Sequence, residues 1–203
     1  MAGPISPWSP GPSYGPVLSQ TDLYLLKTEL TLNPTLEGKN DAYQLQFHLV
    51  TGFTTGASRA QTGEIPGKDE PATHPRVSQL IVISRFSPWC TIVKNDHGVT
   101  IGNVCSAIYK EYTDNEIAEG EFGTLNPRMQ EQVKRIAASN FQQLQQPSGG
   151  AWGYYPPSAP DRLRRVDWLR DRVYFEGLVK DDHYAKTRLG FMAPNIFVME
   201  LVA

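Results

Sequence analysis

The stretch VSQLIVISRFSPWCTIVKNDHGVTIGNVCSAIYKEYT, residues 77–113, decides the fold class, because two strands and a helix are expected in it one after another. Its first part is apolar and rich in β-branched residues, and a second such run follows Ser87 and Pro88, so both runs predict strands. The segment NDHG closes the second strand. Thr100 then stands at an N-cap position, and apolar residues recur at helical spacing up to Thr113.

Similar patterns occur on either side of this stretch. The runs 23–34 and 43–50 alternate apolar and polar residues, which predicts strands. Asn126, as cap, and Pro127, in the first turn, open a second amphipathic helix that ends before Pro147. Its stripe of apolar residues faces a core and its other side is polar, as in a helix that lies on the surface of a domain.

The last part of the chain adds two more strands, in RVYFEGL (172–178) and NIFVMELV (195–202). Strands before, between and after two helices predict an α+β domain: a mainly antiparallel sheet with two main helices packed on one face. We expect this domain over residues 21–203, behind a flexible tail, residues 1–20, that is rich in Pro, Gly and Ser. Long loops are expected at 52–76 and 146–161.

Composition and charge exclude several classes of protein. A formal charge of −2 gives no general attraction for phosphate backbones or anionic membranes, so no nucleic-acid or membrane partner is expected. The first residues do not form a secretory signal, and no apolar run has the length of a membrane span. Cys90 and Cys105 lack the CxxC spacing of zinc sites, and we interpret them as reduced thiols of an intracellular, cytoplasmic protein.

The motifs of common catalytic sites are absent from the sequence. There is no GxGxxG after a strand, no phosphate-binding GxxxxGK[ST], no GxSxG, no HExxH and no EF-hand loop. The four histidines do not pair at ligand spacing. We therefore expect no cofactor and no metal, although a convergent site of other geometry stays open.

The segment RRVDWLRDRVYFEGL, residues 164–178, combines charges and aromatics and is the main candidate for a site. Arginines and aspartates alternate in it, which favours ion pairs within the molecule over a positive patch. Trp168 beside Asp167 and Arg165 could form the wall of a pocket for a small anionic or aromatic ligand. The favoured interpretation is structural: Trp168 fills the core and Asp167 caps a backbone turn. If Trp168 also contacts Trp89, the two rings form a single aromatic floor.

Specific roles follow for the residues of this candidate site. If the protein is an enzyme, Asp167 and His48 are the candidate catalytic acid and base. His48 would serve only if the polar face of its strand lines a cleft. The candidate ligand-binding residues are Trp168, Arg165, Arg85 and Trp89.

Three blocks of sequence, in this order, resemble a known family: NPTL (33–36), SPWCTIV leading into GVTIGNVCSAIY (87–109), and RVDWL with FEGL (165–178). The family is widespread in mushroom-forming basidiomycete fungi and is catalogued only as a domain of unknown function. Asn103 stands where the family tends to have an acid, and the loops 52–76 and 146–161 look longer than is usual. The resemblance implies a shared fold and a fungal lineage and transfers no catalytic residue.

Two functions are compatible with these features. The first is a non-enzymatic binding or scaffold module for a protein or a small hydrophobic or anionic molecule. Its basis is a set of aromatics outside the expected core: Trp8, Tyr14, Trp152, Tyr154 and Tyr155. The alternative is a small cofactor-independent cyclase, isomerase or hydrolase of fungal specialised metabolism, with an aromatic pocket lined by Arg and Asp.

Overall fold

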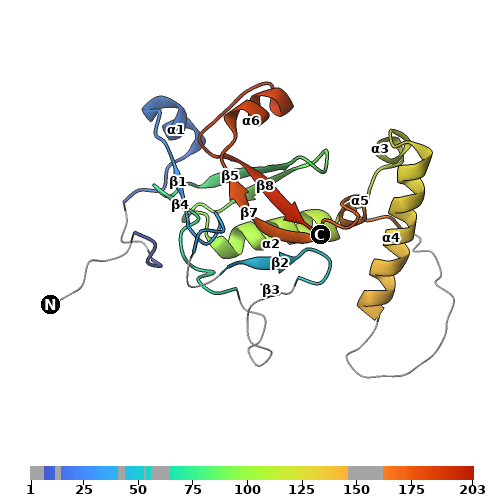
Figure 1. The fold of residues 1–203 in the computed structure, drawn as a ribbon. Helices are drawn as coiled ribbons and strands as arrows, with labels where there is room; N and C mark the ends of the chain where they lie inside the picture. The colour runs from blue at the N-terminus through green and yellow to red at the C-terminus, as the bar shows by residue number, and fades with distance from the viewer. Residues whose placement is uncertain (1–6, 12–14, 41–43, 53, 56–64, 146–161) are drawn as a thin grey trace.

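The computed structural model describes residues 7–11, 15–40, 44–52, 54–55, 65–145 and 162–203. Helices and strands alternate in these residues around one main sheet, which confirms the predicted α+β class (Figure 1). The elements are α1 (Gln20–Leu26), β1 (Thr31–Leu32), β2 (Gln46–His48), β3 (Thr54–Thr55), β4 (Thr73–His74), β5 (Gln79–Ser84), β6 (Cys90–Lys94), α2 (Ile101–Thr113), α3 (Glu119–Gly123), α4 (Pro127–Gln145), α5 (Arg165–Trp168), β7 (Tyr174–Val179), α6 (Asp182–Leu189) and β8 (Ile196–Val202).

The main sheet has the strand order β3-β2-β7-β8-β5-β6, and β1 pairs with β4 in a separate ribbon. Only β5 and β8 run parallel, and the other neighbours in the main sheet are antiparallel. Helix α2 packs on one side of this sheet, while α6 covers a smaller apolar cluster beside β5 and β8. No helix in the described ranges has the length and the apolar character needed to cross a membrane.

Helix α2 begins at the predicted position because both reciprocal hydrogen bonds of a capping box are present. The Thr100 hydroxyl accepts a hydrogen bond from the backbone N–H of Asn103 at 3.3 Å, and the Asn103 side-chain oxygen accepts one from the N–H of Thr100 at 3.1 Å. An acid at position 103 would accept the same bond. Asn103 therefore completes the capping box of α2.

Helix α4 also begins where the sequence predicts, since the Asn126 side chain accepts a hydrogen bond from the backbone N–H of Met129 at 2.9 Å. Val133 and Ala137 lie on its buried side. Its main contact with another element is with α5, and Figure 1 shows it standing beside the sheet. This second long helix therefore reaches the core of the domain largely through α5.

The predicted strand at residues 23–34 is wrong over its first part, because residues 20–26 form helix α1. Ser19 and Asp22 form a capping box in which the Asp22 carboxylate accepts the backbone N–H of Ser19 at 2.8 Å. The cap stabilises the first turn of a helix, and the helix continues to Leu26. The strand therefore begins only at Thr31.

The expected tail and loops are described only in part. Leu18 joins the domain, because its N–H donates to the carbonyl of Arg76 at 2.8 Å and its carbonyl accepts from Ser78 at 2.9 Å. The segment 52–76 contains β3 and β4, and Thr73 in β4 is fully buried. Residues 146–161 lie outside the described residues, as do Tyr14, Trp152, Tyr154 and Tyr155.

Two of the sequence blocks meet at Gly177. Asn33 holds the NPTL turn, since its side-chain oxygen accepts a hydrogen bond from the N–H of Thr35 at 2.9 Å. The carbonyl of Leu36 then accepts the N–H of Leu178 at 2.7 Å. A Cβ atom at Gly177 would lie 2.9 Å from that same carbonyl oxygen. The close approach of the turn to β7 therefore requires glycine at this position.

We expect Gly177→Ala to lower the free energy of unfolding by about 1–3 kcal/mol, because the turn at Leu36 must move to admit the methyl group. Urea unfolding followed by circular dichroism measures the change. Gly120→Ala in α3 is the matched control, since a Cβ there meets no atom within 4 Å. Equal stability of the two variants would contradict the steric argument.

Candidate functional site

The predicted aromatic floor is present. The rings of Trp89 and Trp168 meet edge to face, with centroids 5.2 Å apart and an angle of 68° between planes. The guanidinium of Arg165 lies over the Trp89 ring, 4.7 Å from its centroid. Trp89 directly precedes β6, and the other two residues belong to α5. The fold thus brings together two of the sequence blocks at this aromatic cluster.

The polar atoms around this cluster bond to one another. The indole N–H of Trp89 donates to the Glu121 carboxylate at 2.7 Å, and Arg165 forms an ion pair with Glu111. The Tyr112 ring also contacts Trp89 edge to face, with 6.2 Å between centroids. Burial raises the pKa of the Tyr112 hydroxyl to about 12. The cluster therefore links β6, α2, α3 and α5.

Asp167 lies at the junction of α4 and α5 and is 1 % exposed. One carboxylate oxygen accepts the backbone N–H of Arg164 at 2.8 Å and so caps α5, and the other accepts the side-chain N–H of Asn140 at 2.8 Å. Burial raises the pKa of the carboxyl group, although both hydrogen bonds favour the charged form. This arrangement matches the structural role that the sequence favoured for Asp167.

Arg85 and His48 lie apart from the aromatic cluster. Arg85 forms ion pairs with Asp181 and Glu200, and its guanidinium lies 4.8 Å from the centroid of the Tyr184 ring. It therefore fastens α6 to the sheet. His48 is on β2, and three strands, β7, β8 and β5, separate it from β6 in the sheet.

His48 is 8 % exposed, while Gln46 on the same face is half-buried and Gln44 is exposed. Its ring meets that of Tyr174 edge to face, with 4.7 Å between centroids, and its Nδ1 accepts the N–H of Thr51 at 3.2 Å. Burial lowers the pKa of the imidazole. The environment thus favours the neutral ring, with Nδ1 as acceptor.

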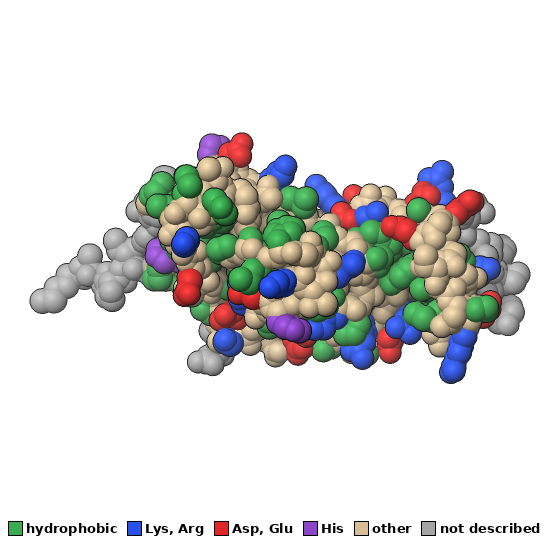
Figure 2. Space-filling model, turned by 90° about the horizontal axis from the view of Figure 1, so that it is seen from above, with side chains coloured by type: hydrophobic (Ala, Val, Ile, Leu, Met, Phe, Trp, Pro, Cys, Tyr) green, Lys and Arg blue, Asp and Glu red, His purple; other side chains and the backbone are tan. Residues whose placement is uncertain are grey.

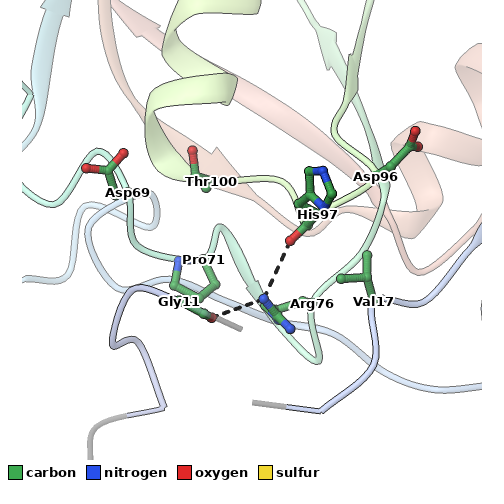
Figure 3. Close-up of a pocket in the computed structure, with 9 residues that line it drawn as sticks. Gly11, Val17, Asp69, Pro71, Arg76, Asp96, His97 and Thr100 are labelled. Carbon is green, nitrogen blue, oxygen red and sulfur yellow. Dashed lines mark hydrogen bonds between the residues drawn. The ribbon is translucent and has the colours of Figure 1, made fainter. Parts of the chain in front are cut away.

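A cavity of about 420 Å³ lies beside Arg76, and its lining includes Gly11, Val17 and His97 (Figure 3). The Arg76 guanidinium donates to the carbonyls of Gly11 at 3.1 Å and Gly15 at 2.8 Å. A weaker bond of 3.5 Å runs to the carbonyl of His97. Arg76 therefore fastens the segment that precedes α1. Near it the ring of Trp8 contacts His74, with 6.4 Å between centroids.

A different surface stands out by its apolar character. Helix α1 and the loop between α6 and β8 carry five of the eight exposed large hydrophobic side chains in the described part of the chain. Their exposure ranges from 53 % to 80 %. We call this the α1–loop surface; its members are Tyr24, Leu25, Leu26, Phe191 and Met192. Viewed from above α1 and α6, hydrophobic side chains gather in this region among charged ones (Figure 2).

A groove runs between α1 and the loop at this surface, with a volume of about 550 Å³. Leu23, Leu30 and Pro194 contribute apolar lining, and charged side chains are part of the same lining. These charged residues are Lys27, Glu29, Lys180 and Asp182. The groove therefore combines an apolar floor with both signs of charge, as a binding site for a peptide or small molecule requires.

Side-chain hydrogen bonds of Asn195 join α1 to the start of β5. Asn195 is fully buried and donates through its side chain to the Gln20 side chain at 2.7 Å and to the backbone carbonyl of Gln79 at 3.0 Å. Leu23 is the buried residue of α1, so the residues that follow it in the helix face outward. The exposed apolar side chains are thus presented on a fixed helix.

The loop on the other side of the groove is also held. The ammonium group of Lys180 donates to the carbonyls of Ala193, Pro194 and Ile196, at 2.5, 3.1 and 3.2 Å. It also pairs with Asp182 at 2.9 Å. Lys180 therefore sets the path of the loop, and its charge is largely neutralised within the molecule.

The α1–loop surface was not predicted, because the alternation of apolar residues over 23–34 indicates a strand that includes residues 23–26. In a strand, half of LYLL would face the core. The Ser19-x-x-Asp22 pattern was the signal that could have indicated a helix. Phe191 and Met192 carried no such signal, since isolated apolar residues in a loop are common.

The described residues contain no group of three or more His, Cys, Asp or Glu side chains placed to hold a metal ion. Three cavities found among these residues, of about 310–550 Å³, are lined by residues other than Asp167, Trp168 and Arg165. Within the described residues the aromatic cluster joins elements of the fold to one another, so the α1–loop surface is the stronger candidate for contact with another molecule.

Comparison with known proteins gives one match. The model of a protein family described as "Family of unknown function (DUF6699)" matches residues 43–187. No curated protein and no solved structure matches the chain. The matched region includes α2, the aromatic cluster and β7, and it ends within α6.

We expect Asp167→Ala to lower the free energy of unfolding by about 2 kcal/mol or more, since it removes a helix cap and leaves the buried Asn140 amide without its acceptor. Thermal unfolding followed by circular dichroism tests this. Asp171→Ala, at an exposed position nearby, is the control and should change stability little. A stable Asp167→Ala variant would contradict the structural role.

The lowered pKa of His48 predicts a dependence of stability on pH. As the pH falls below the usual histidine pKa of 6.5, the unfolded chain binds a proton that folded His48 still resists, so the native state loses stability. We expect the loss between pH 7.5 and pH 5 to be smaller in His48→Gln. His183→Gln, at an exposed position on α6, controls for the loss of an imidazole. Identical pH profiles for wild type and His48→Gln would contradict this explanation.

Proposed function

We propose that this chain, which belongs to the DUF6699 family of unknown function, is a protein-binding module and that the α1–loop surface contacts its partner. The observation that carries the proposal is the concentration of exposed apolar side chains on one fixed helix and the adjoining loop. Exposed apolar patches rimmed by polar groups mark interaction sites on soluble domains. The function is therefore one of recognition.

The composition of α1 supports this proposal. A helix on the surface of a domain usually turns polar residues outward, but α1 turns Tyr24, Leu25 and Leu26 outward in succession. Burying one side chain of this size contributes about 1.5–3 kcal/mol. A partner that covers several of them gains enough free energy to offset much of the cost of association.

The groove supports a partner with a protruding apolar segment. Its volume of about 550 Å³ falls in the range of ligand-binding clefts, roughly 300–1,000 Å³. Because hydrogen bonds within the molecule hold α1 and the loop, few groups must lose conformational freedom on binding. A short helix with apolar side chains on one side fits such a groove.

The enzymatic alternative, a cofactor-independent enzyme of fungal specialised metabolism, has less support. Its proposed acid, Asp167, is engaged by Asn140 and Arg164, and its proposed base, His48, belongs to a different part of the sheet. We also propose a basidiomycete origin, from the order of the three sequence blocks. A cytoplasmic location is supported by the free thiols of Cys90 and Cys105.

The proposal can be tested by selecting peptides from a displayed library of amphipathic helices against the full-length protein, immobilised at low density. Affinity is then measured by fluorescence anisotropy. We expect selected peptides to bind the double variant Leu25→Asp/Met192→Asp at least tenfold more weakly than wild type, because the charges disrupt the apolar contact.

Ile92→Asp is the matched control. Ile92 is 55 % exposed on β6, close to the 53 % of Phe191, but it lies outside the α1–loop surface. Peptide affinity should be unchanged in this variant. Peptides that bind wild type and double variant equally well, or a selection that yields no binding peptide, would contradict the proposed function.

A further inference from the structure

We infer that the partner of the α1–loop surface is a second copy of the same chain, arranged about a twofold axis so that α1 of each copy enters the groove of the other. This inference rests on the proposed function, since it names the partner of the same surface. It follows from three properties of that surface: its shape, its charges and the rigidity of its two sides.

The shape is that of a protrusion beside a hollow. Tyr24, Leu25 and Leu26 project from α1 with exposures of 80 %, 68 % and 63 %. The groove next to them has Leu23 and Leu30 in its lining. In a twofold interface the same patch serves both copies, so a residue that protrudes from one copy needs a recess in the same patch of the other. The α1–loop surface provides both.

The charges on the rim of the groove are also self-complementary. Lys27 and Glu29 are both exposed, and within the described part of the chain neither side chain forms an ion pair. The other two charges, on Lys180 and Asp182, already pair with each other. A second copy would place Lys27 opposite Glu29 on both sides of the axis. The net charge of −2 gives little long-range repulsion between copies.

If the partner is a second copy, both sides of the interface contribute the same apolar area. Each chain brings the same five exposed side chains, so both faces of the interface are apolar, as in homodimers. Ser19 and Asn195 fix α1, and Lys180 fixes the loop, so neither side of the groove must be ordered on association. A partner with a polar face would lose the hydration of its polar groups against these side chains without gaining hydrogen bonds.

The test is sedimentation equilibrium of the full-length protein from about 1 to 100 μM, which spans ordinary homodimer affinities. We expect wild type to form a dimer that dissociates on dilution, and Leu25→Asp to weaken the dimer at least tenfold. Ile92→Asp should dimerise like wild type, since Ile92 lies outside the surface. A dimer that persists in Leu25→Asp would overturn the inference.

The charge pairing has its own test. Lys27→Glu and Glu29→Lys should each weaken self-association severalfold, because each places like charges across the axis. An equimolar mixture of the two variants should form a dimer again, since every rim pair is then of opposite sign. If the mixture associates no better than the single variants, the proposed arrangement is wrong.

A monomeric wild type across the concentration range would overturn the inference of a second copy. If selected peptides still bind the groove in that case, the protein-binding function stands and the partner is a different chain. If peptide binding also fails, the proposed function fails as well. The two measurements therefore separate the partner from the function.

Discussion

The position of the C-terminal strand β8 between β5 and β7 is the constraint on which the remaining structure depends. Through β8 the antiparallel pair β5–β6 is joined to the strands β7, β2 and β3. Because β8 runs parallel to β5, the chain must cross back to the beginning of β5 before it enters the sheet. That crossing brings Asn195 beside α1, where its side chain bonds to Gln20. The groove and the apolar surface follow from this return.

The aromatic cluster serves the same architecture at another place in the molecule. Trp89 is far in sequence from Arg165 and Trp168, which lie together in α5, and the contacts among the three join α5 to the start of β6. The Glu121 carboxylate accepts the indole N–H of Trp89, and Glu111 pairs with Arg165. These two polar groups next to the packed rings therefore have partners. Charge next to an aromatic ring is therefore compatible with a supporting role as well as with chemistry.

Contacts in the fold join the three sequence blocks 33–36, 87–109 and 165–178. NPTL forms a turn that lies against β7, and Gly177 in the last block leaves room for its carbonyl group. The middle block supplies β6, the cap of α2 and Trp89, which meets Trp168 of the last block. Residues of separate blocks are thus in direct contact.

The sequence alone determined the elements whose signals are local: α2 and α4 from their caps and apolar spacing, and β5, β6 and β8 from their β-branched runs. It did not determine α1, since a short apolar run is compatible with either period and the decisive cap lies before it. Only the tertiary structure decided that His48 is covered, that Arg85 holds α6, and that α1 and the loop form one surface. These features depend on which distant segments meet, and the hydrophobic pattern of a segment records that it is buried but not what buries it.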